Sequence, residues 1–281
     1  MKTALIGALT NFSFLEGASH PHEMVETAAA MGWHAIGIQD NGTMAGIVRA
    51  HMAAQEAGIK LLIGVRLTLH DGVDVALYAR NREGYGSICQ LLSQLHMSYA
   101  RPAGEASSTA VKAHMADMSR LSEHVAVVIQ PPSEPDEGLY RLYQALATLV
   151  KGPLYGGGYL CRDGGDEARL HKMQDYAKAA KIPFIALAAA HYHISDRRPL
   201  ADVLCCIKHK TTLKDAGHLL SRNAEYVLRT PQEMRRLWRG YEAALDQADA
   251  FAQDCDFAMS ELSYEYPEEI LSKGRSAIDE L

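Results

Sequence analysis

The chain has 281 residues, of which 48% are apolar, and carries 28 basic against 34 acidic side chains, a net charge of −6. This length is ample for a buried core, in one large domain or two small ones. The acidic balance argues against nucleic-acid binding driven by global charge. The longest apolar run, residues 182–190, is too short to cross a bilayer.

The amino terminus lacks the layout of a signal peptide. The five cysteines include no pair with the two-residue spacing of a zinc or redox motif, and Cys205 and Cys206 are adjacent. We therefore expect a reduced, cytoplasmic protein.

Short apolar runs alternate with amphipathic stretches along most of the chain. The runs that predict strands are residues 3–9, 34–38, 61–69, 73–79, 125–129, 152–160 and 183–188. The stretches that predict helices are residues 19–31, 43–57, 82–96, 138–150 and 165–180. This alternation predicts an α/β fold with a mainly parallel sheet. A barrel is favoured over an open sheet because no glycine-rich phosphate loop follows the first strand.

Local signals refine this pattern. Ser19 offers a cap to the first helix, whose first turn tolerates Pro21, and Asp71-Gly72 predicts a turn. Residues 97–110 are rich in Ala, Ser, Gly and Pro and predict a mobile surface loop, while the prolines of residues 130–137 exclude a regular element.

From Arg197 the sequence becomes predominantly helical, at residues 199–209, 231–238 and 242–255. In the second of these helices Met234, Leu237 and Trp238 share one face, which we expect to pack against the barrel or a partner outside this chain rather than to form a ligand site. We expect a barrel over residues 1–196, a helical extension packed on it over 197–262 and an exit linker over 263–281.

Thirteen histidines raise the question of a metal site. His191 and His193 follow a predicted strand, where a spacing of two would place both rings on one face, at the strand end where α/β barrels carry their sites. His20 and His22 lie at a helix start and are better read as surface residues. Because Ala188, Ala189 and Ala190 precede the first pair, a structural role is favoured for it as well.

The sequence resembles a known family. Residues 11–21 (NFSFLEGASHP) look like the opening of the polymerase-and-histidinol-phosphatase (PHP) domain of bacterial C-family DNA polymerases, and especially of the error-prone branch. The similarity continues through residues 45–50, 58–60, 64–67 and 81–85. It resumes at residues 191–193, 197–200, 202–204, 223–225 and 264–267.

The resemblance implies a distorted (β/α)7 barrel and a set of metal-ligand positions that this chain has largely lost. The matching positions are Gly7, Leu9, Asp40, Asn41, Arg66, Ala189 and His191. Only Asp40 and His191 keep ligand side chains, with Glu16 a possible outlying carboxylate. We therefore expect a vestigial site with no catalytic residue and no bound metal, in which Arg66 pairs with Asp40 and an anion could contact Arg66 and His191.

The resemblance further implies a parent enzyme that synthesises DNA across lesions in damage-induced mutagenesis and DNA repair, with Mg²⁺ in a polymerase core outside these residues. This chain would then be a structural domain whose partner is that core, and would meet DNA, sliding-clamp and mutasome proteins only through the parent. Two alternatives stay open. One is an active metal-dependent phosphoesterase or 3′–5′ exonuclease with an atypical ligand set drawn from His20, His22, His171, His191, His193 and Cys161. The other is a stand-alone interaction module.

Overall fold

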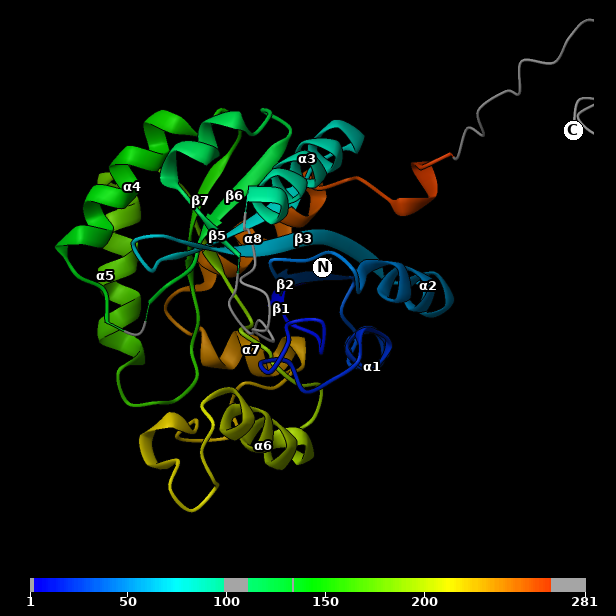
Figure 1. Cartoon of the computed structure of the whole chain (residues 1–281), viewed down its shortest axis with the longest axis vertical. Coiled ribbons are helices and arrows are strands. Elements are labelled where there is room, and N and C mark those ends of the chain that lie inside the picture. Colours follow the sequence, from blue (N-terminus) through cyan, green and yellow to red (C-terminus); the bar gives the residue numbers. More distant parts are fainter. Residues whose placement is uncertain (1–2, 99–110, 133, 264–281) are drawn as a thin grey trace, which may run out of the picture.

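The computed structural model describes residues 3–98, 111–132 and 134–263. Its centre is one curved sheet (Figure 1). The strands are β1 (Ala4–Ala8), β2 (Ala35–Asn41), β3 (Lys60–Leu69), β4 (Asp74–Ala79), β5 (Lys112–Ala113), β6 (Val125–Ile129), β7 (Leu154–Gly158) and β8 (Phe184–Ala186). Their order is β1-β2-β3-β4-β6-β7-β8, and the short β5 pairs with the end of β3.

All neighbouring strands run parallel except β4, which is antiparallel to both β3 and β6. The predicted turn at Asp71-Gly72 connects β3 to β4. The segment that follows β8 closes the sheet onto β1, because the Ala188 amide donates to the Ile6 carbonyl at 2.7 Å and the Leu9 amide donates to the Ala190 carbonyl at 2.8 Å. The predicted α/β fold, a nearly closed barrel, is confirmed.

Helices surround this barrel, and 3₁₀ turns connect several of them (Figure 1). They are α1 (Pro21–Ala30), α2 (Ile47–Ala57), α3 (Arg82–Ser98), α4 (Glu137–Leu149), α5 (Asp166–Ala179), α6 (Arg198–Lys208), α7 (Pro231–Leu237) and α8 (Glu242–Asp254). Within the described residues, no helix combines the length and apolar character that a bilayer crossing requires.

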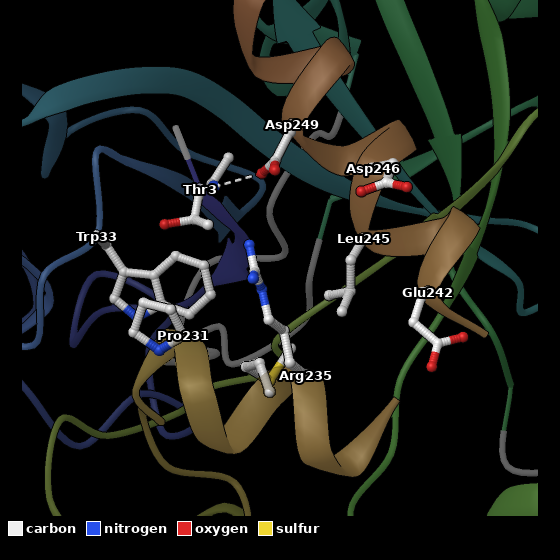
Figure 2. Close-up of a pocket in the computed structure, with 10 residues that line it drawn as sticks. Thr3, Trp33, Pro231, Arg235, Glu242, Leu245, Asp246 and Asp249 are labelled. Atoms are coloured by element: carbon white, nitrogen blue, oxygen red, sulfur yellow. Dashed lines mark hydrogen bonds between the residues drawn. The ribbon is translucent and has the colours of Figure 1, made fainter. Parts of the chain in front are cut away.

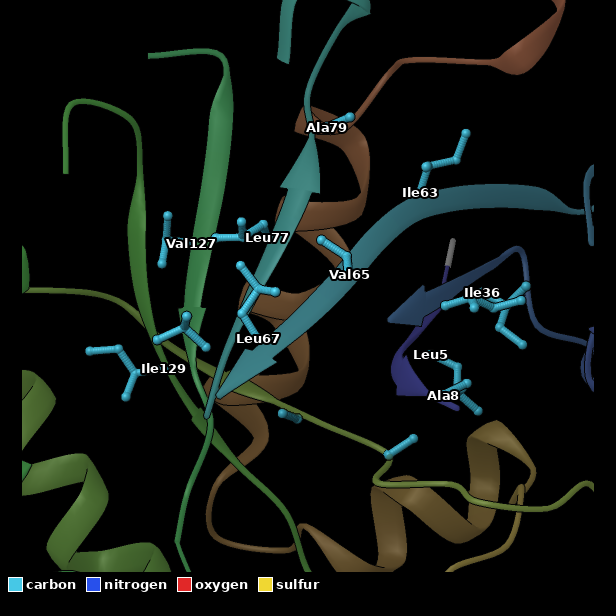
Figure 3. Packing of buried hydrophobic residues seen from close by; sticks show 14 of the residues in the cluster. Leu5, Ala8, Ile36, Ile63, Val65, Leu67, Leu77, Ala79, Val127 and Ile129 are labelled. Carbon is cyan, nitrogen blue, oxygen red and sulfur yellow. The ribbon is translucent and has the colours of Figure 1, made fainter. Parts of the chain in front are cut away.

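The main hydrophobic core lies between the outer face of the sheet and the helices. Figure 3 shows part of it, with Val65 and Leu67 of β3 beside Leu77 of β4 and Val127 and Ile129 of β6. These side chains are completely buried. Alternate residues of each strand point to this outer face, and the side chains of the residues between them fill the barrel interior.

Tyr78 occupies the centre of the interior and is completely buried. Its hydroxyl donates to the Gln39 side-chain oxygen at 2.9 Å. The ring fits because Gly64 has no side chain: a Cβ there would lie 2.6 Å from a ring carbon of Tyr78. Phe251 of α8 meets the same ring edge-on, with centroids 5.2 Å apart, so α8 closes the amino-terminal end of the barrel.

The predicted helices and strands all occur, with small differences at their ends. α3 extends to Ser98, so Met97 belongs to a helix rather than to the expected loop. Ser19 does not cap α1, because His20 holds the cap position and its amide donates to the Glu23 carboxylate at 2.8 Å.

Trp238 is completely buried in the main core, as predicted. Residues 99–110 and 264–281, for which a mobile loop and most of an exit linker were expected, lie outside the described residues.

Candidate functional site

A cavity of about 270 Å³ opens where the parallel strands end, the end at which α/β barrels carry their sites. Five of the seven predicted positions line it: Gly7, Leu9, Arg66, Ala189 and His191. Gly7 and Ala189 both have positive φ values, +94° and +48°, so the backbone itself departs from regular strand geometry here. The structure therefore brings these five positions together around one cavity.

Asp40 is buried beside the cavity but does not line it. One carboxylate oxygen accepts from the Thr10 amide at 2.7 Å and from the Ser13 hydroxyl at 2.6 Å, and the other accepts from the Thr10 hydroxyl at 2.6 Å. Burial raises the pKa of Asp40 above its ordinary value, although these hydrogen bonds oppose the shift. Asn41 follows on β2, and its backbone amide donates to the Ser13 hydroxyl oxygen at 3.0 Å. The expected pair of Arg66 with Asp40 is wrong, because Thr10 and Ser13, in the loop after β1, already satisfy the Asp40 carboxylate.

Arg66 pairs instead with two other carboxylates. Its guanidinium contacts Glu16, and its Nε lies 3.6 Å from an oxygen of Asp74. Glu16 also pairs with Lys208 of α6, at 3.2 Å. We call Glu16, Arg66, Asp74 and Lys208 the Arg66 network. Burial would raise the pKa of Glu16, but the positive charges of Arg66 and Lys208 outweigh it and hold that pKa below its ordinary value.

His191 is the one imidazole that lines the cavity in the part of the chain that the structure describes. Burial, together with the positive charges of Arg66 and Lys208, lowers its pKa to about 4, although Glu16 opposes the shift. The ring is therefore neutral at pH 7, and it packs against Tyr226 with centroids 4.8 Å apart.

The other histidines do not converge on this cavity. His193 was expected to share a strand face with His191, but β8 ends at Ala186 and His193 instead hydrogen-bonds the Ser19 hydroxyl at 2.7 Å. His20 and His22 stack on each other at the start of α1, and His171 faces Asp175 on α5. The atypical ligand set that was left open is thus dispersed over the molecule.

The residues of the cavity do not fit the metal cluster of the family. Gly7, Leu9 and Ala189 carry no donor atom, and the positive charge of Arg66 occupies the position between Glu16 and Asp74. A cluster of catalytic metals needs several imidazole and carboxylate ligands that converge on one point. One imidazole beside a fixed guanidinium does not supply them.

One group of three potential ligand side chains occurs among the described residues, at Cys161, Asp163 and Asp166. Arg169 already occupies it, with nitrogens 2.9 Å from Asp163 and 2.5 Å from Asp166. The Asp166 carboxylate also accepts from the amides of Cys161 and Arg162. This group is a salt-bridged turn that positions the start of α5.

A second hollow, of about 360 Å³, lies at the opposite end of the barrel between α7, α8 and the start of β1. Figure 2 shows Trp33 and Leu245 beside it, with Glu242, Asp246 and Asp249 along α8. Asp249 accepts a hydrogen bond from the Ala4 amide at 2.7 Å. This end of an α/β barrel serves stability rather than chemistry, so we do not assign a site there.

Sequence reasoning missed several residues of the cavity, among them Gln39, Asp74, Tyr159 and Tyr226. One of them could have been found. The turn at residues 71–72 sets a hairpin register in which Asp74 faces Thr68, two residues from Arg66 and therefore on the same face. Tyr159 directly follows β7 and Tyr226 lies in the loop after α6, and no sequence pattern connects those segments.

Comparison with known proteins identifies the relatives of this chain. A family model described as "PHP domain" matches residues 8–151. Error-prone DNA polymerases of Bradyrhizobium diazoefficiens and Brucella abortus are 38% and 37% identical over 98% and 97% of this chain, which aligns with 24% and 25% of their lengths. Error-prone DNA polymerase 2 of Agrobacterium fabrum is 33% identical over 99% of the chain and 25% of its own length. The chain thus spans about a quarter of these relatives.

Solved structures with the same fold are more distant in sequence. A protein assigned as a metal-dependent phosphoesterase from Bifidobacterium adolescentis has a TM-score of 0.50 and 16% identity, over 85% of this chain and 96% of that one. An amidohydrolase from Chromobacterium violaceum has a TM-score of 0.51 and 14% identity, over 68% and 88%. These two show the fold alone. Together with the family model, which covers half of the chain, the comparisons show that the chain belongs to the PHP domain family.

Proposed function

We propose that this chain is the PHP domain of an error-prone DNA polymerase and that it serves there as a non-catalytic structural domain. The polymerase assignment is supported by relatives of that name, which match almost the whole chain. The non-catalytic assignment depends on one observation above all: the guanidinium of Arg66 sits in the cavity between two carboxylates.

The chemical argument concerns charge. Phosphoester hydrolysis by clustered metals uses the metal charge to activate water and to neutralise the phosphate. An arginine remains protonated at any workable pH, so Arg66 repels a cation at close range in a partly buried pocket. Arg66 neutralises the charges of Glu16 and Asp74, as a metal ion would, but a guanidinium cannot bind and activate a water molecule as a metal ion does. The barrel keeps its ion pairs and loses the means to hydrolyse.

The activity of the whole protein then belongs to residues outside this chain. We propose that the parent carries out DNA synthesis across lesions, in damage-induced mutagenesis and DNA repair, with Mg²⁺ in its polymerase core. The core of the same polypeptide would be the direct partner of this domain. Contacts with DNA, the sliding clamp and mutasome proteins would be made through the parent.

The test compares three forms of the full-length polypeptide: unchanged, lacking residues 1–262, and carrying His191→Ala. Primer extension and thermal unfolding are measured on each. A structural role predicts that the deletion lowers both the thermal midpoint of the remaining protein and its extension rate, whereas His191→Ala leaves extension unchanged. A truncated protein as stable and as active as the full-length one would contradict the proposed role.

A further inference from the structure

A helical unit beside the cavity exposes an unusual amount of apolar surface. It comprises residues 195–222, with α6 and two 3₁₀ turns, and lies apart from the sheet at the bottom of Figure 1. We call it the α6 unit. Only Cys206 and Ala216 are buried within it. Five of its large apolar side chains are 40–56% exposed: Leu200, Val203, Ile207, Leu213 and Leu219.

The exposed residues of α6 form one face. Leu200, Val203 and Ile207 are three and four positions apart, the spacing that aligns side chains along one side of a helix. Leu213 and Leu219, in the segment that follows α6, are also exposed. Contiguous apolar surface of this kind on a folded domain marks an interaction site rather than ordinary surface.

Ion pairs hold the α6 unit in a fixed position on the barrel. At the start of the unit, Arg197 pairs with Glu23 of α1. At the end of α6, Lys208 pairs with Glu16, which is itself bound to Arg66. Because the α6 unit is anchored at both ends, its apolar face is held in one orientation. Binding of a partner then costs little free energy for ordering this face.

We infer that this apolar face docks another part of the same, longer polypeptide, an inference that rests on the proposed function. Relatives that match almost the whole chain are about four times its length, so most of their residues lie outside the matched region. The α6 unit carries six basic against three acidic side chains, although the chain as a whole is acidic. Its partner surface therefore has an apolar centre with an acidic rim.

The position of the surface has a consequence for the cavity. Ser221, from the end of the α6 unit, lines the cavity, and Lys208 connects α6 to the Arg66 network at its edge. A protein segment docked on α6 would lie near this edge of the cavity. Permanent docking there is compatible with a cavity that admits no substrate.

The test is the accessibility of one cysteine in two lengths of the protein. Ile207→Cys is introduced into this 281-residue chain and into the full-length polypeptide, and its alkylation rate is followed by peptide mass spectrometry. Met52→Cys is the matched control, because Met52 of α2 is 58% exposed against 56% for Ile207 and lies on another helix. Both positions are exposed, so neither substitution disturbs the core.

Docking predicts that position 207 reacts at least tenfold more slowly in the full-length polypeptide than in this chain, while position 52 reacts alike in both. Equal rates at position 207 would overturn the proposed docking surface. They would leave the non-catalytic assignment unaffected, because the metal content of the purified chain tests that assignment separately. Protection at position 207 that grows with the concentration of the 281-residue chain would also overturn it, because a second copy would then be the occupant.

Discussion

Replacement of Arg66 by methionine tests how the Arg66 network stabilises the fold. Arg66→Met keeps an unbranched aliphatic stem but removes the charged guanidinium, which leaves Glu16 with Lys208 alone. Breaking a fully buried ion pair costs about 3–5 kcal/mol, whereas exposed pairs contribute about 0–1 kcal/mol. The Arg66 and Glu16 side chains are 13% and 23% exposed and Lys208 remains 3.2 Å from Glu16. We therefore expect a loss of about 2 kcal/mol in the free energy of unfolding at pH 7.

The pH dependence of this loss has a definite sign. Because folding lowers the pKa of Glu16, its stabilisation is fully present above the ordinary value of 4.5 and disappears as the pH falls through the folded-state pKa. Urea denaturation followed by circular dichroism should thus show a smaller difference between Arg66→Met and the unchanged chain at pH 3 than at pH 7. The control is Arg120→Met, because the Arg120 side chain is 62% exposed and its pair with Asp117, at 3.4 Å, contributes about 0.5 kcal/mol or less. An Arg66→Met protein as stable as the unchanged chain at pH 7 would refute the reasoning.

Three further predictions concern the core and the cavity. Trp238→Ala should lower the free energy of unfolding by about 3–5 kcal/mol, because the ring is completely buried; a near-neutral result in urea denaturation would show that the ring does not stabilise this chain. Gly64→Ala should cost about 1–3 kcal/mol because its Cβ would meet the tyrosine ring inside the barrel. Gly86→Ala in α3, where nothing lies within 4 Å, should be neutral or stabilising, and similar losses at the two glycines would argue against the clash. The pKa of the His191 imidazole, followed by NMR, should be about 4, and it should be higher in Arg66→Met because the nearby positive charge of Arg66 lowers it. A midpoint near 6.5 in the unchanged chain would contradict the desolvated, cation-flanked position of the ring.

Hydrophobic periodicity was enough to predict the framework of the fold. The predicted strand at residues 125–129 and the observed β6 (Val125–Ile129) have the same bounds, because a strand buried on both faces reads as a continuous apolar run. The turn at Asp71-Gly72 predicted the β3–β4 hairpin for a similarly local reason. These signals lie within a few residues, so a sequence reveals them directly.

The details of the site depended on contacts that local patterns do not encode. Thr10 and Ser13 reach Asp40 across about 30 residues of sequence and displace the expected pair with Arg66. The strand alternation expected for His191 and His193 fails because the regular strand β8 ends at Ala186 and Ala189, with a positive φ, breaks the alternation before His191. The family resemblance named five positions that line one cavity, but only the folded chain shows which carboxylates Arg66 contacts.

The most direct measurement of the central claim is the metal content of the purified chain after dialysis against Mn²⁺ and Zn²⁺, together with its activity on phosphate monoesters and DNA 3′ ends. With Arg66 between Glu16 and Asp74, and without donors at Gly7, Leu9 and Ala189, we expect far less than one metal ion per chain and no hydrolysis. Retention of a stoichiometric metal cluster, with phosphatase activity that His191→Ala abolishes, would contradict the account.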